Sequence, residues 1–180
     1  MSMAPADQVV SHYFSAARHA ARRTNSTADA YAANAERLSA LFVLLSGFEA
    51  FLNCYFRILA DELGDPCRSK IIAIADNRRE ALRGKALKLP WQAFGSRSKA
   101  MDAAIAEIEQ YIAIRHRFMH LKHDWSSITT DNNVTIRDLM DTTVMNHDLR
   151  WKLLPLFVAI RRYMKATFAL RGDHRYFARD

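Results

Sequence analysis

The sequence is poor in residues that interrupt helices or cross-link chains: its 180 residues include five glycines, four prolines and two cysteines. So few helix breakers, in a chain that is 50% apolar, favour an all-α domain. Cys54 and Cys67 are too few for a disulfide framework, which favours a reducing, cytoplasmic location. The longest apolar runs, LFVLL and LLPLFVAI, are too short to span a bilayer, and the N-terminus lacks the apolar core of a signal peptide. We therefore expect one cytoplasmic domain over residues 1–180, without membrane association.

Acidic residues are scarce in one segment of the chain. Between Arg68 and Lys99, only Asp76 and Glu80 oppose nine basic residues, so this segment accounts for the whole net charge of +7. The basic residues are Arg68, Lys70, Arg78, Arg79, Arg83, Lys85, Lys88, Arg97 and Lys99. A concentrated basic surface is typical of proteins that bind polyanions. A charged face that only keeps the protein in solution has the same composition, so the segment alone leaves both interpretations open.

Apolar residues at helical spacing predict two helices in the first third of the chain. The first covers about 7–23, and the polar residues 24–27 break it and offer caps for the next. The second is long, about 28–63, with an apolar stripe that begins at Leu38 and ends at Leu59. Gly64 then occupies a position where a left-handed cap favours glycine. This pattern predicts an all-α bundle with a long second helix.

The basic segment contains shorter elements. A helical piece is expected over about 78–88, interrupted at Gly84, and a loop is expected over 89–95. This loop carries Trp91 and Phe94 beside basic residues. Such aromatic side chains either stack on bases or plug a loop into the core, and plugging into the core is the commoner case.

The most regular amphipathic helix is expected over about 98–120. Its apolar stripe consists of Ile105, Ile108, Ile112 and Met119. Arg115 falls in the same series, and because a guanidinium does not lose its charge, it needs a carboxylate, a phosphate or a wet cleft. Glu49 is a matching exception on the long second helix, so a pair with Arg115 is suggested. The alternative is that Glu49 turns to solvent or hydrogen-bonds to Asn53.

Two further elements are expected after this helix. Two β-branched runs within 128–136 flank Asp131-Asn132-Asn133, which is a signal for a β-hairpin. From about 137 to 170 the pattern is helical again, and Pro155 predicts a kink or a break in that helix. The chain shows no internal repeat and no second domain.

The segment Arg115-His116-Arg117-Phe118-Met119-His120 has the form of an arginine, four residues and a histidine. Here the sequence resembles the HEPN superfamily (higher eukaryotes and prokaryotes nucleotide-binding domains), whose catalytic members carry an Arg-x4-6-His motif near the end of a helix. The stretch LSGFEAFLNCYFRIL, with Glu49, resembles the long second helix of these proteins. The resemblance implies an up-and-down helical bundle, with one small hairpin after the motif helix.

The resemblance also implies a metal-independent endoribonuclease of bacterial defence or toxin–antitoxin type. It would act as a homodimer, without a cofactor, by attack of a ribose 2′-hydroxyl on the adjacent phosphate. His120 could move the proton, Arg115 could hold the phosphate, and His116 could orient either one. The expected RNA contacts are Arg78, Arg79, Arg83, Lys85, Lys88 and Lys122. Lys122 also stands where toxins paired with nucleotidyltransferase antitoxins carry a tyrosine, so regulation through that tyrosine is not expected.

Three other interpretations of the same residues remain open. Some HEPN proteins lack activity, so the chain could be a non-catalytic module that binds nucleotide, RNA or a protein partner such as an antitoxin. His116, His120 and His123 share one face of an ideal helix and could bind zinc or nickel, although the neighbouring arginines oppose a cation site. Finally, Arg115 could have the purely structural role of pairing with Glu49.

Overall fold

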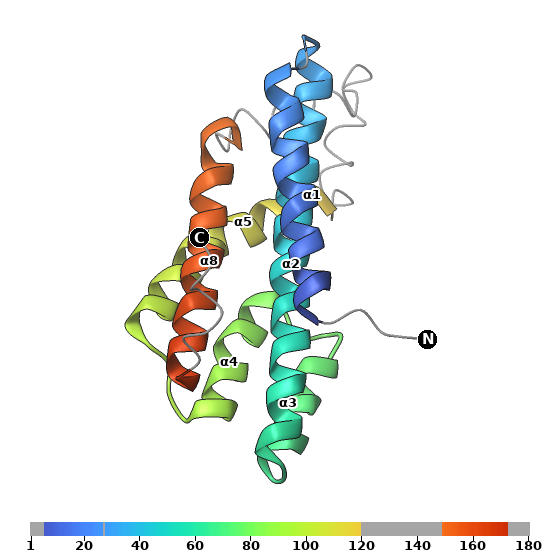
Figure 1. Ribbon diagram of the computed structural model, residues 1–180. Helices are drawn as coiled ribbons and strands as arrows, with labels where there is room; N and C mark the ends of the chain where they lie inside the picture. The colour runs from blue at the N-terminus through green and yellow to red at the C-terminus, as the bar shows by residue number, and fades with distance from the viewer. Residues whose placement is uncertain (1–5, 27, 120–148, 173–180) are drawn as a thin grey trace, which may run out of the picture.

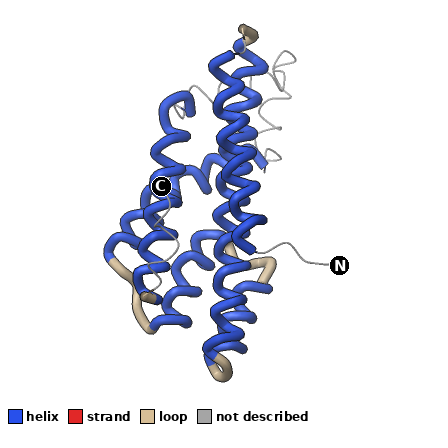
Figure 2. Tube along the Cα trace, in the orientation of Figure 1, coloured by secondary structure: helices blue, strands red, loops and turns tan. Residues whose placement is uncertain are grey.

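The computed structural model describes residues 6–26, 28–119 and 149–172, and throughout these ranges the regular structure is helical (Figures 1 and 2). The helices are α1 (Ala6–Ser26), α2 (Ala30–Leu63), α3 (Cys67–Asp76), α4 (Leu82–Phe94), α5 (Lys99–Met119) and α8 (Leu149–Arg171). The prediction of an all-α bundle is thus confirmed for the described residues. The predicted hairpin within 128–136 lies outside them.

Helix α2 is the central element of the bundle. It packs along α1 over its N-terminal half and against α3, α4, α5 and α8 further on (Figure 1). Its predicted stripe is buried except for the half-buried Tyr55. Residues outside the stripe such as Leu44 and Phe51 are buried too, because neighbours surround the helix on several sides. Its start differs from the prediction: α1 continues to Ser26, and Asp29 caps α2 by accepting a hydrogen bond from the Tyr31 amide at 3.0 Å. At its end, Gly64 has a φ of 67°, as a glycine cap allows.

The length and composition of α2 would also suit a membrane-spanning helix. Half of its most apolar stretch is buried inside the described bundle. A helix packed on several sides needs apolar residues on each of them, so its position in the bundle accounts for this composition.

Helix α4 corrects two predictions. It runs without interruption at Gly84, and it continues to Phe94, through the segment expected to be a loop. Pro90 lies inside it and has no N–H to donate to the carbonyl of Ala86 four residues earlier. The hydroxyl of Tyr163 on α8 donates to that carbonyl instead, at 2.7 Å. The bond lost within α4 is therefore replaced by a bond between helices.

The two aromatic residues of this segment have different environments. Phe94 packs edge-on against Phe56 of α2, with ring centroids 6.1 Å apart, as an anchor in the core would. Trp91 is 55% exposed, so the prediction that it plugs into the core is wrong.

Helix α8 accommodates a proline as α4 does. Pro155 lies inside α8, and the described helix continues through this residue without a break.

Candidate functional site around Arg115

Arg115 lies at the edge of the core, near the end of α5. The buried residues of α5 before it are Met101, Ala104, Ile105, Ile108, Tyr111 and Ile114. Arg115 is one turn beyond Tyr111 on the same side of the helix, and its side chain is 31% exposed. The sequence pattern therefore placed this arginine on the correct face, at the point where the core gives way to solvent.

Glu49 of α2 is the carboxylate that faces Arg115. Its Oε2 atom lies 3.7 Å from Nη1 of Arg115, which confirms the predicted pair. Its other oxygen, Oε1, lies 3.7 Å from Nζ of Lys85 on α4. Both separations exceed the usual length of a hydrogen bond, so Glu49 acts mainly by its charge and leaves the donors of the guanidinium available for a closer acceptor.

Lys85 is the member of this group that sequence reasoning misplaced. We expected it among the surface contacts for RNA, but it is only 4% exposed. Its ammonium donates to the carbonyl of Ala75 at 3.0 Å and to Oδ1 of Asn53 at 3.2 Å. A buried charge needs such partners, and they connect α4 to both α3 and α2. Lys85 is therefore a structural cation, which a surface ligand does not reach.

We call Arg115, Glu49 and Lys85 the Arg115 cluster. Two cations share one carboxylate, so the cluster keeps a formal charge of +1. Lys85 is enclosed, and only Arg115 and Glu49 are open to solvent, each by about a third of its side chain. An anion would therefore approach the cluster at the guanidinium, which presents paired donors suited to the oxygens of a phosphate.

Tyr111 fixes the helix turn that precedes Arg115. Its ring is 1% exposed, and its hydroxyl donates to the backbone carbonyl of Lys152 on α8 at 2.8 Å. Burial raises the pKa of this phenol, so it stays a neutral donor. The end of α5 is thus attached to α8 through Tyr111 and faces α2 through Glu49.

The histidines of the predicted site are only partly described. His116 is exposed on the turn that carries Arg115. His120, His123 and Lys122 lie outside the described residues, and so does most of the three-histidine alternative. Among the residues that the structure does describe, no group of three histidine, cysteine or acidic side chains is placed to hold a metal ion.

The basic surface is more compensated than the sequence count indicates. Arg83 pairs with Glu109 of α5 at 2.9 Å, and Lys88 pairs with Glu80 at 2.7 Å. By contrast, Arg78 and Arg79 are exposed in the connection between α3 and α4, and neither forms an ion pair with a described residue. Of the expected RNA contacts that the structure describes, these two are the exposed charges without an ionic partner.

Comparisons with protein-family models, with curated proteins and with solved structures give no match for this chain.

Proposed function

We propose that the protein is an HEPN-like endoribonuclease, which acts as a homodimer and needs no metal ion. The observation that carries the proposal is the Arg115 cluster. It holds an arginine of an Arg-x4-His motif at the edge of the core, oriented by a carboxylate that cancels only half of the cluster's positive charge. An arginine held in this way is suited to a phosphate whose charge grows during the reaction.

The proposed reaction is a transesterification within the RNA chain. The 2′-oxygen of a ribose forms a bond to the adjacent phosphorus, and the bond from phosphorus to the 5′-oxygen of the next nucleotide breaks. The products are a 2′,3′-cyclic phosphate and a 5′-hydroxyl. His120 takes the proton from the 2′-hydroxyl or gives one to the leaving oxygen. Arg115 stabilises the negative charge on the non-bridging oxygens, and His116 orients that phosphate.

Two further features of the chain support a role on RNA. The exposed Arg78 and Arg79 add positive charge that no described carboxylate neutralises, which favours the approach of a polyanion. One arginine and one histidine are few residues for catalysis. In the proposed homodimer, a two-fold axis near the motif helices would bring a second arginine and a second histidine to the same site. The cellular setting that fits such an enzyme is bacterial defence or a toxin–antitoxin pair.

The experiment is a cleavage assay with purified protein and total RNA, with and without EDTA. We expect cleavage in both conditions, and its loss in Arg115→Ala and His120→Ala. Arg23→Ala is the matched control, because Arg23 also pairs with a carboxylate on α2, Glu36 at 2.8 Å, on a different pair of helices. Full activity of His120→Ala, or loss of wild-type activity in EDTA, would contradict the mechanism.

A non-catalytic module is the second candidate, and one observation favours it. The Arg115 cluster joins α2, α4 and α5, so the same arginine could serve to hold the bundle together. In that case the purified protein would bind RNA or a protein partner without cleaving RNA, and Arg115→Ala would lower its thermal stability while His120→Ala would leave the protein unchanged.

A further inference from the structure

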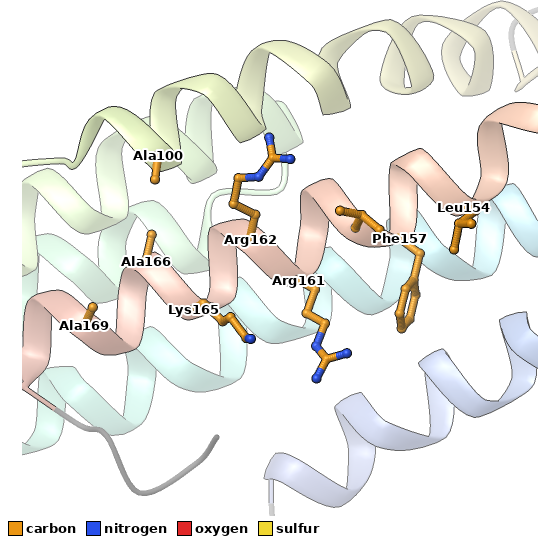
Figure 3. A pocket seen from close by; sticks show the side chains of 9 residues that line it. Ala100, Leu154, Phe157, Arg161, Arg162, Lys165, Ala166 and Ala169 are labelled. Carbon is orange, nitrogen blue, oxygen red and sulfur yellow. The ribbon is translucent and has the colours of Figure 1, made fainter. Parts of the chain in front are cut away.

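The groove between α1 and α8 is a candidate binding site formed by other helices than the Arg115 cluster. It has a volume of about 410 Å³, which lies in the range of pockets that hold small molecules. Along α8 it extends from Phe157 to Met164, about two turns or roughly 10 Å, so it fits a ring system and not a long chain. Figure 3 shows the side chains of Phe157 and Arg161 on the side of α8 that faces α1, whereas Arg162 points toward α5.

The floor of the groove is apolar. Phe14 of α1 and Phe157 of α8 meet edge to face, with ring centroids 5.7 Å apart, and both are half-buried against the core. Met164, about two turns after Phe157, is also half-buried and lines the same groove. Aromatic rings and a thioether are favourable neighbours for a flat aromatic group. The floor therefore suits the ring of a ligand.

The rim of the groove is polar and basic, and none of the described lining residues is acidic. The guanidinium of Arg18 on α1 lies over the ring of Phe157, 5.8 Å from its centroid. A ring attracts a cation but does not cancel its charge, and Arg18 has no ion pair with any residue in the described part of the chain. Arg161 lines the groove as well, but it has an interaction of its own, so the charge left to a ligand is that of Arg18. Ser15, on the preceding turn of α1, adds an exposed hydroxyl.

We propose that this groove binds a small aromatic anion, which is an aryl phosphate or an aryl carboxylate. The ring of this ligand packs on Phe14, Phe157 and Met164, and its anionic group accepts hydrogen bonds from Arg18 and Ser15. Phe157 already holds the guanidinium at the groove, so binding orders few additional groups. A single cation of this kind suits a single anionic group, whereas a polyanion such as RNA gains its affinity from several phosphate contacts. The proposal does not depend on nuclease activity.

The test is isothermal titration calorimetry of the full chain with naphthyl phosphate, and with naphthoate to distinguish a phosphate from a carboxylate. We expect saturable binding of at least one of these anions at a single site per chain. Naphthol lacks the charge and inorganic phosphate lacks the ring, so each should bind at least roughly tenfold more weakly. Failure of both aromatic anions to bind, or equal binding of naphthol, would overturn the proposal.

Variants of the protein locate the binding. Arg18→Gln should weaken binding of the naphthyl anion at least roughly tenfold, because it removes the charge and the paired donors of the guanidinium. Arg18→Lys keeps the charge and loses the paired donors, so its affinity should lie between those of the wild type and Arg18→Gln. The matched control is Arg22→Gln, one turn later on α1, because Arg22 is exposed, has no ion pair with a described residue and does not line the groove. It should change binding less than about twofold. Circular dichroism checks the fold of each variant.

Three results with these variants would count against the groove as the site. The first is a loss of affinity in Arg18→Gln that is no larger than in Arg22→Gln. The second is loss of binding in Arg115→Gln while Arg18→Gln binds normally, which would place the anion at the Arg115 cluster. The third concerns RNA as the occupant. A short single-stranded RNA should not displace the naphthyl anion, and displacement that Arg18→Gln abolishes would assign the groove to RNA.

Discussion

Replacement of Lys85 by methionine tests whether the buried ammonium holds the Arg115 cluster together. Methionine has a similar length and no charge, so Lys85→Met removes the donor and keeps most of the volume. The change leaves the carbonyl of Ala75 and Oδ1 of Asn53 without the donor that now lies at 3.0 and 3.2 Å. Each buried acceptor left unsatisfied costs about 1–3 kcal/mol. The gain from no longer burying a charge offsets part of this cost.

We therefore expect Lys85→Met to lower the free energy of unfolding by about 2–4 kcal/mol. In a domain of this size, each kcal/mol lowers the melting temperature by about 2–4 °C, so the expected decrease is roughly 5–15 °C. Lys88→Met is the matched control, on the same helix. Lys88 pairs with Glu80, but its side chain is 56% exposed, and an exposed ion pair contributes at most about 1 kcal/mol.

Urea unfolding followed by circular dichroism measures both variants. The expected result is a lower midpoint for Lys85→Met at an unchanged slope, with a much smaller shift for Lys88→Met. If Lys85→Met costs no more than Lys88→Met, the ammonium is not a necessary link between α2, α3 and α4. If the protein cleaves RNA, Lys85→Met also lowers the formal charge of the Arg115 cluster from +1 to zero, and RNA binding at low salt should weaken.

Three other predictions follow from single residues. Glu49→Gln raises the formal charge of the Arg115 cluster to +2, so RNA should bind more tightly at low salt in an anisotropy assay. Cleavage should fall, because Arg115 loses the carboxylate that orients it. Unchanged binding and unchanged cleavage would refute this prediction. Gly47→Ala should lower the free energy of unfolding in urea by about 1–3 kcal/mol, because the added Cβ would lie 2.7 Å from Cβ of Tyr13 on α1. In the control Gly84→Ala, the added Cβ meets only the flexible end of the Glu80 side chain, so this variant should be nearly neutral. Equal costs for the two variants would refute the close approach of α1 and α2 at Gly47. Burial raises the pKa of Tyr163 above the ordinary value of about 10, so its contribution to stability is present below that pH and is lost as the pH rises above it. In a titration to alkaline pH, we expect the phenolate absorbance of Tyr163 to appear only when the helical signal is lost. Phenolate absorbance that appears earlier in the wild type, and is absent from Tyr163→Phe, would contradict the raised pKa.

Hydrophobic spacing predicted those parts of the fold in which one helix face decides the structure. The stripe of α2 and the position of Arg115 on α5 were found in this way, because a period of 3.6 residues reports burial directly. The same spacing did not show that α2 is surrounded by neighbours, since burial of Leu44 and Phe51 outside the stripe depends on helices that are distant in the sequence. It did suggest the Arg115–Glu49 pair, because each residue breaks an apolar pattern.

Local rules failed in α4 because contacts from elsewhere override them. Gly84 and Pro90 both disfavour the interior of a helix, yet both lie inside α4. The carbonyl that Pro90 leaves without a partner receives the hydroxyl of Tyr163, which is distant in the sequence. Once the segment is a helix, Trp91 lies about 200° round from the buried Leu89, which explains why it is exposed.

The burial of Lys85 follows from the same spacing argument that identified Arg115. Leu82, Lys85, Ala86 and Leu89 are buried on α4 and are separated by threes and fours, so the lysine occupies an apolar series. The break expected at Gly84 divided this series and hid the pattern. With α4 continuous, the described helices α2, α4 and α5 each carry one charged residue within an apolar series, and these residues are the three members of the Arg115 cluster. A charged residue on an apolar helix face needs a partner of opposite charge, and here each cation finds it in the carboxylate of Glu49. The two cations exceed the one carboxylate by a single positive charge. Because Lys85 is enclosed, solvent and ligands meet that charge at Arg115.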